Sequence, residues 1–110
     1  MTYAYPSMVK ERLDTLPADS SQDVKIEAKL QQANVMINFE LSFYTSIPVS
    51  APDVLVDMLA EVEADLAAGL FLEDRGPAMA ERANVFKNRA REALDKIINL
   101  FFKRGVVETG

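Results

Sequence analysis

The pattern of hydrophobic and polar positions is most regular in the last third of the chain. Between Pro77 and about Lys103, apolar residues recur in steps of three or four, which places them on one narrow stripe of an α-helix. We therefore predict a long amphipathic helix whose stripe packs into the core. The stripe consists of Met79, Ala83, Phe86, Ala90, Leu94, Ile97 and Phe101.

The same spacing predicts a short helix and a long one before it. Ser7 is suited to cap the short helix, which covers about residues 8–16. Ser20, with Asp23 three residues later, resembles a capping box that starts a long helix ending near Tyr44. The buried stripe of this long helix is expected to contain Ile26, Leu30, Ala33, Ile37, Leu41 and Tyr44.

A third long helix is predicted after the linker 47–52, which contains two prolines and is therefore stiff. Ser50 is expected to cap it, with Pro52 in its first turn, and the turn 73–77 ends it. Its stripe consists of Leu55, Leu59, Val62, Leu66 and Leu70. No segment has strand-like alternation. The sequence thus predicts one all-α domain, residues 1–110: an arm (1–6), a bundle of one short and three long helices (7–105) and a tail (106–110).

Composition removes several classes of function. The 110 residues include no cysteine and no histidine, so thiolate chemistry, the commonest general base and the commonest metal ligand are all missing. We expect a protein that is not an enzyme and that binds no cofactor or metal. The longest apolar run, Leu66 to Leu72, is far shorter than the ~20 residues of a transmembrane helix. The first residues do not resemble a secretory signal, and we expect no membrane association.

Charge is distributed unevenly along the chain. Residues 1–74 carry 4 basic and 13 acidic side chains (−9), whereas residues 75–110 carry 8 basic and 4 acidic ones (+4). Opposite charges on different surfaces favour head-to-tail contact between copies, although they can equally be neutralised within one copy. The net charge of −5 disfavours tight nucleic-acid binding.

Two charged stripes are candidate contact surfaces. An acidic ladder on the third helix is either a solvated face or a face that meets a basic partner; a metal site would need ligands from further elements. A basic stripe on the last helix either borders the core with its long side chains, pairs with the ladder of a neighbouring copy, or contacts phosphate. The ladder is Asp53, Asp57, Glu61 and Asp65, and the stripe is Arg82, Arg89, Lys96 and Lys103.

Two apolar surfaces complete the candidates. The end of the last helix is apolar nearly all the way round, so it is either core covered by the arm with Tyr3 and Tyr5, or a protein interface. The second half of the second helix has an additional apolar side, which needs a second neighbour, internal or from another chain. These surfaces contain Ile97, Ile98, Phe101 and Phe102, followed by Lys103 and Arg104, and Met36, Phe39 and Phe43.

With the helices placed, residues 7–105 resemble the small head–tail connector (adaptor, or head-completion) proteins of tailed phages. The likeness is one of layout: a short first helix, a long helix that ends in an aromatic and a proline turn, a second proline that opens the next helix, and a last helix with small residues that ends near a glycine. An arginine often precedes the turn tyrosine in that family, and Phe43 stands there in this chain. The matching segments are 8–13, 43–49, 51–55, 81–83, 89–94 and Gly105.

The resemblance implies a structural virion protein at the head–tail junction (neck), assembled in the host cytoplasm. It would form a ring of about a dozen copies under the portal protein, contact a tail-side or stopper protein, and pass the DNA through its lumen without specific binding. An acidic lumen would suit DNA that slides without sticking. The alternative that the residues themselves leave open is a soluble cytoplasmic helical protein-binding or regulatory module that acts as a dimer.

Overall fold

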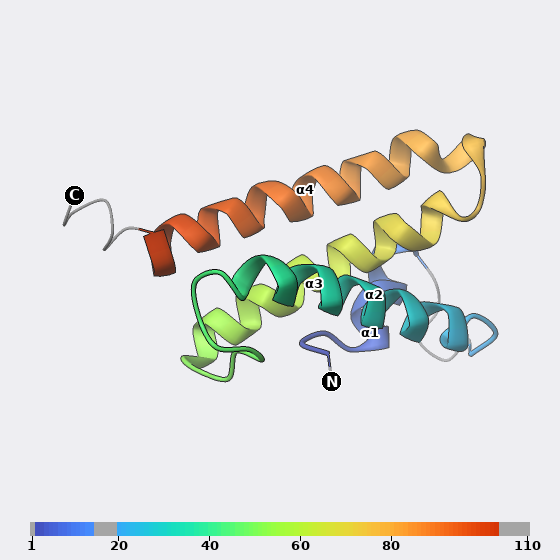
Figure 1. The fold of residues 1–110 in the computed structure, drawn as a ribbon. Coiled ribbons are helices and arrows are strands. Elements are labelled where there is room, and N and C mark those ends of the chain that lie inside the picture. The colour runs from blue at the N-terminus through green and yellow to red at the C-terminus, as the bar shows by residue number, and fades with distance from the viewer. Residues whose placement is uncertain (1, 15–19, 104–110) are drawn as a thin grey trace.

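The computed structural model describes residues 2–14 and 20–103, and these residues are all helical or irregular (Figure 1). No strand occurs in these two ranges, and 76% of the structure is helix, so the predicted all-α bundle is confirmed. The helices are α1 (Pro6–Arg12), α2 (Asp23–Leu41), α3 (Asp53–Glu73) and α4 (Ala80–Ile98), with a 3₁₀ turn η1 (Pro77–Met79) before α4 and a π-helical turn η2 (Asn99–Lys103) after it.

The third helix, α3, is the element on which the others pack. It runs through the middle of the molecule, with α4 along one side and α1 and α2 on the other (Figure 1), and it contacts all three. By contrast, α2 and α4 have almost no direct contact with each other. The two helices therefore pack on different sides of α3 and do not pack against each other.

Small residues let α4 approach α3 closely. Gly69 faces α4, and a Cβ atom built on it would lie 2.6 Å from Cγ of Lys87 and 3.0 Å from the carbonyl oxygen of Ala83. The second of these is a backbone atom, which cannot move without moving α4. Glycine at position 69 is therefore required by the close packing of the two helices.

Prolines, rather than the expected serines, mark two helix starts. Pro6 occupies the first turn of α1, and Pro52 is the extended residue before α3. Proline suits this place because it presets φ and its missing N–H has no intrahelical partner there. The predicted caps Ser7, Ser20 and Ser50 are wrong, since neither these two helices nor α2 has a side-chain hydrogen bond at its cap.

Two predicted helix ends also differ. The second helix ends at Leu41, where the hydroxyl of Ser42 donates to the carbonyl oxygen of Phe39 (2.6 Å), so Tyr44 is exposed instead of buried. Gly76, with φ of 108°, forms the turn between α3 and η1. The single helix predicted from Pro77 is divided into η1, α4 and η2. The first helix ends at Arg12 and not near residue 16, because the chain turns at Leu13 and Asp14, where φ of Asp14 is 57°. The tail 106–110 lies outside the described residues.

The predicted apolar stripes form the core with few exceptions. The stripe of the last helix is buried from Ala83 to Ile97, whereas Met79 is half-buried and Phe101 is 39% exposed. Phe101 is exposed because the π-helical turn η2 changes the direction of side chains after Ile98. The expectation that Phe101 belongs to the buried stripe is therefore wrong.

A carboxylate lies fully buried within this core. Glu63, in the middle of α3, has no exposed surface. Its side chain accepts hydrogen bonds from the backbone N–H of Ala4 (2.9 Å) and from Nδ2 of Asn34 (2.9 Å). The N-terminal arm and α2 thus both supply donors to a group on α3, which compensates part of the cost of burying a charge.

The hydrogen-bond chain continues from Asn34 to the linker before α3. Oδ1 of Asn34 accepts from Nδ2 of Asn38 (3.2 Å), and Oδ1 of Asn38 accepts from the hydroxyl of Tyr3 (2.6 Å). That hydroxyl in turn accepts from the backbone N–H of Val49 (2.9 Å). Every donor in this chain points toward Glu63, so the carboxylate, which is acceptor-only when ionised, sets the direction of the whole network.

The first prediction reverses one donor in this network. In Asn34→Asp, two carboxylates of nearly unchanged shape would face each other where Asn34 now donates to Glu63. We expect the free energy of unfolding in urea at pH 7 to fall by about 2–4 kcal/mol, with partial recovery near pH 4, where one carboxyl takes up a proton. Asn84→Asp on the exposed surface of α4 is the matched control, and an equal loss in both variants would contradict the role of the network.

The second prediction concerns pH. Burial raises the pKa of Glu63 above its ordinary value of 4.5, and the hydrogen bonds from Ala4 and Asn34 offset this only in part. The folded chain therefore holds this proton more tightly than the unfolded chain. The corresponding stability is present at low pH and is lost as pH rises through the folded pKa.

Glu63→Gln isolates this contribution because glutamine does not titrate. We expect the unfolding free energy of the wild type minus that of the variant to decrease as pH rises from about 4 to about 7. Urea unfolding of both proteins at each pH measures the difference. A constant or increasing difference would show that the folded pKa of Glu63 is not raised.

Candidate protein-interaction surface

The predicted acidic ladder and basic stripe meet inside one chain. Asp65 is nearly buried, and its Oδ1 lies 2.6 Å from Nε of Arg12 and 2.8 Å from Nη2 of Arg89. The other oxygen of Asp65, Oδ2, accepts from Nε of Arg89 (3.2 Å). One carboxylate of α3 therefore holds guanidinium groups from both α1 and α4.

A second carboxylate joins this cluster. Oε1 of Glu61 lies 2.5 Å from Nη2 of Arg12. Burial lowers the pKa of Arg12, but its hydrogen bonds to Asp65 and Glu61 raise it, and the net shift is upward. For Arg89 the hydrogen bond to Asp65 is the largest cause of a raised pKa. The carboxylates beside them thus favour the charged form of both guanidinium groups.

The interpretation that the two stripes pair across neighbouring copies is wrong for Asp65 and Arg89. Both lie on the side of the α3–α4 pair that faces α1, so they are close enough to pair within the chain. Arg82 also lies on this side, 3.2 Å from Asp14. Asp53, Asp57 and Lys96 are exposed and form no ion pair within the part of the chain described; the side chain of Lys103 and all of Arg104 lie outside it.

The apolar end of the last helix divides between core and surface. Ile97 and Ile98 are buried, whereas Leu100 is 57% exposed. Phe102 is half-buried and stacks on Tyr44 at 6.2 Å between ring centroids. The residue that covers the end of the helix therefore comes from the turn after α2. Of the two tyrosines of the arm, Tyr3 packs against the core cluster that contains Ile97 and Ile98, whereas Tyr5 is 72% exposed and covers nothing there.

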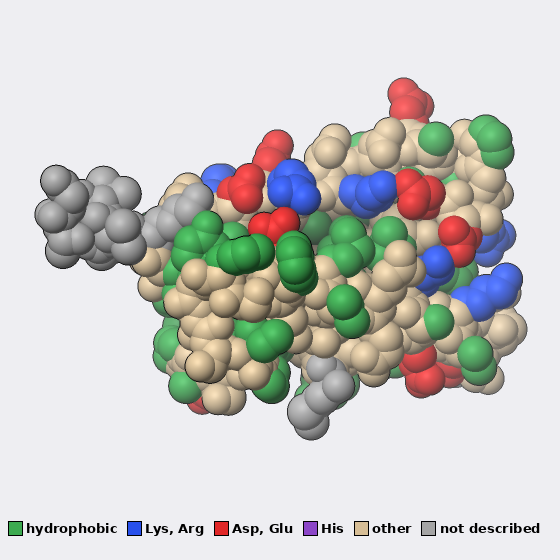
Figure 2. Space-filling model, viewed as in Figure 1, with side chains coloured by type: hydrophobic (Ala, Val, Ile, Leu, Met, Phe, Trp, Pro, Cys, Tyr) green, Lys and Arg blue, Asp and Glu red, His purple; other side chains and the backbone are tan. Residues whose placement is uncertain are grey.

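The additional apolar side of α2 faces outward. Phe39 and Phe43 are 64% and 68% exposed and contact each other edge to face, with ring centroids 5.3 Å apart. Met36, one turn before Phe39, is 42% exposed. In Figure 2, hydrophobic side chains gather in a band along the junction between α2 and α4. The surface made by Met36, Phe39, Phe43, Tyr44, Leu100 and Phe101 is called the aromatic surface below.

The aromatic surface adjoins an apolar groove of about 190 Å³ between α2 and α4. The groove exists because these helices lie apart on α3, whose Val62 and Leu66 form its floor. Met36 belongs both to the groove and to the aromatic surface. The walls of the groove consist of Met36, Ile37 and Glu40 of α2, and of Lys87, Asn88, Ala90, Arg91 and Leu94 of α4.

The exposed apolar area is large for a chain of this size. The exposed fractions of the six residues of the aromatic surface add up to about three whole side chains, roughly 600 Å² if each exposes about 200 Å². The largest apolar patch on a typical monomer is about 300–600 Å², and a stable interface buries about 800 Å² per partner. The aromatic surface and groove together have the size of a protein interface.

Metal sites and membrane-spanning helices are the other features considered, in residues 2–14 and 20–103. Within these ranges, no three acidic side chains lie close enough together to hold a metal ion. No helix there is long and apolar enough to span a membrane.

Comparisons with models of known protein families, with curated proteins and with solved structures gave no match for this chain. The structure by itself describes a small all-α protein with an exposed aromatic surface beside a groove.

The third prediction tests the ion cluster. Asp65→Asn removes the charge that two arginines share, and we expect the free energy of unfolding to fall by about 1–3 kcal/mol because Arg12 stays largely buried without its main partner. Asp57→Asn, two turns away on the same helix and exposed, is the matched control, with an expected change within about 0.5 kcal/mol. Urea unfolding measures both, and equal effects would show that the cluster does not stabilise the fold.

Proposed function

We propose that this chain is a structural protein that works by assembling with copies of itself and with other proteins, as a head–tail connector of a tailed phage. The observation that carries the first part is the aromatic surface beside the groove. A surface of this size is at the upper limit for a monomer and favours a protein partner, because a large exposed apolar area is a source of aggregation.

The connector part rests on the layout of the chain. A short helix, a long helix that ends in an aromatic and a proline turn, a proline-opened third helix and a long last helix follow each other in the order that the resemblance implies. Phe43 and Tyr44 of that turn lie exposed at the end of α2. In a connector, such a turn is available for contact with another subunit.

The remaining details of the proposal follow from the resemblance. The chain would form a ring at the neck of the virion, beneath the portal protein and above a tail-side or stopper protein. DNA would pass through the ring without specific binding, which suits a chain with 17 acidic and 12 basic residues. No catalytic role is proposed, since the sequence has neither histidine nor cysteine.

One feature favours a second candidate function. The groove between α2 and α4 has an apolar floor and polar rims, which is the form of surface that accepts an amphipathic helix of another protein. A helical binding module that acts as a dimer would use the same surface in this way.

The fourth prediction separates the two functions. Native mass spectrometry and negative-stain imaging of the purified chain, alone and with the portal protein of the same virus, should show closed rings of many subunits. Phe43→Ser with Phe101→Ser should abolish these rings while leaving helix content unchanged, because both side chains are exposed. The control is Val24→Ser, an exposed apolar residue at the other end of α2. A stable dimer that never assembles on the portal would contradict the connector function.

A further inference from the structure

We propose that copies of this chain meet head to tail, with the groove between α2 and α4 of one copy receiving the first half of α3 of the next copy. The inference rests on the self-assembly in the proposed function and names the two surfaces that would carry it. The entering surface is called the acidic strip and consists of Val54, Asp57, Met58 and Glu61.

The acidic strip is a continuous face of one helix. Its four residues are spaced three, one and three positions apart, so they lie along one side of α3. Val54 is 57% exposed and Asp57 is exposed, whereas Met58 is half-buried. Apolar and acidic side chains therefore alternate along this face, on which Val54 and Asp57 are open to a partner and Met58 packs partly against the chain's own core.

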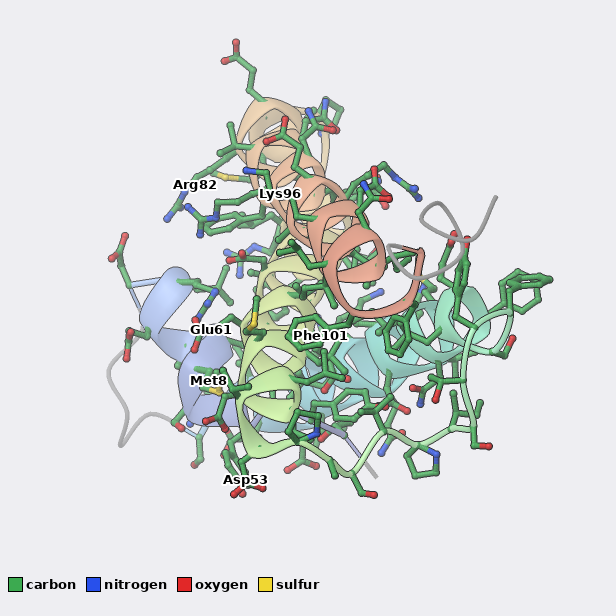
Figure 3. All side chains as sticks on the ribbon, turned by 90° about the vertical axis from the view of Figure 1, so that its left-hand side faces the viewer. Met8, Asp53, Glu61, Arg82, Lys96 and Phe101 are labelled. Carbon is green, nitrogen blue, oxygen red and sulfur yellow. The ribbon has the colours of Figure 1, made fainter. Side chains whose placement is uncertain are left out.

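The strip and the groove lie on opposite sides of the molecule. Figure 3 looks along the bundle and shows Glu61 on the side of α3 next to Met8 of α1, while α2 lies on the other side of α3. The groove is on that other side, because α2 and α4 form its walls. Two different surfaces on opposite sides are what a heterologous contact needs, and such a contact closes into a ring if its rotation divides a full turn.

The basic stripe of α4 cannot be the mate of the strip in this arrangement. Arg82 and Arg89 lie on the same side as the strip and are held by Asp14 and Asp65 of their own chain. The positive charges that face the groove come from the other side of α4. They belong to Lys87, which also contacts Glu73 at 2.6 Å, and to Arg91.

Glu61 of the strip and Lys87 of the groove are paired within the chain, with Arg12 and Glu73, whereas one charge on each surface is left for a neighbouring copy. Among the described residues, no ion pair involves Asp57 or Arg91. Asp53, the residue before the strip, is exposed and also has no ion pair in this part of the chain. Contact between the strip and the α4 wall would bring Asp57 to Arg91, which fixes the register of an otherwise apolar contact.

The dimensions of the two surfaces also agree. From Val54 to Glu61 the strip extends about 10 Å along α3, and the wall from Lys87 to Leu94 has the same length of about 10 Å. The groove has about 190 Å³. An apolar cavity of about 150 Å³ holds a benzene molecule, so this groove has room for the side chain of Val54.

The test uses two variants, each with one damaged surface. Val54→Lys with Asp57→Lys damages the strip, and Met36→Ser with Arg91→Glu damages the groove and its rim. All four residues are exposed, so both variants should keep the circular dichroism spectrum of the wild type. Glu27→Lys, a charge reversal at the exposed first half of α2, is the control and should assemble like the wild type.

The expected result is specific to a head-to-tail contact. Each variant alone should need at least a tenfold higher concentration than the wild type to assemble. An equimolar mixture should form a dimer with one copy of each variant and nothing larger, because only one intact strip and one intact groove can meet. Native mass spectrometry distinguishes this dimer by mass.

Three outcomes would overturn the inference: either variant assembling like the wild type, a mixture that stays monomeric although the wild type assembles, or homodimers formed by the strip variant alone. If the wild type forms rings but the mixture stays monomeric, the inference fails and the proposed function stands. If the mixture forms the dimer but the wild type never binds a portal protein, the proposed function fails and the inference stands.

A second measurement does not depend on loss of assembly. The chain contains no cysteine, so Asp57→Cys with Arg91→Cys introduces one thiol on each side. Under mild oxidation, neighbouring copies should be joined into a ladder of covalent multimers, because a disulfide needs Cα atoms about 4.4–6.8 Å apart. Each single variant can form at most a covalent dimer. No ladder from the double variant under conditions in which it assembles would contradict the contact.

Discussion

The buried carboxylate of Glu63 is the constraint on which the arrangement of the chain depends. Apolar packing is non-directional and would allow α2 and the arm several positions on α3. Glu63 needs donors at fixed points, and Ala4 and Asn34 supply them. Through Asn38 and Tyr3 the same network reaches the backbone of Val49, so the arm, α2 and the linker are all placed relative to α3. With α2 held by this network, α4 packs on α3 alone, and the groove remains between them.

The all-α class of the fold and the order of its helices could be predicted from the sequence because helical periodicity is a local signal. Helix starts were less predictable. Three serines suited to capping were expected to start helices, but the chain uses Pro6 and Pro52, whose fixed φ serves the same purpose without a side-chain hydrogen bond. The end of the last helix was also misjudged, since the π-helical turn after Ile98 has no signature in a pattern of apolar residues.

For the charged surfaces, the sequence predicts which residues share a helix face but not which helices lie next to that face. Spacing identified the face on which Asp65 and Arg89 lie, but it contains no information on which helices are neighbours, and Arg12 of α1 was not recognised as their partner. The burial of Glu63 was not predicted, because Glu63 does not belong to the regular acidic ladder of α3. A signal was present: Asn34 and Asn38, one turn apart, border the buried stripe of α2, where polar side chains need a buried partner.

Internal pairing changes which interactions remain for assembly. The cluster at Asp65 and the pair of Arg82 with Asp14 occupy Arg89 and Arg82, two of the four residues of the basic stripe, so these two contribute to the fold. What remains on the other side is apolar area with Arg91 at its edge. In the proposed head-to-tail contact, the first half of α3 would offer this side apolar side chains flanked by acidic ones. A chain that carries both surfaces on opposite sides has what unlimited or ring-like self-assembly requires, whereas a chain with one such surface stops at a dimer.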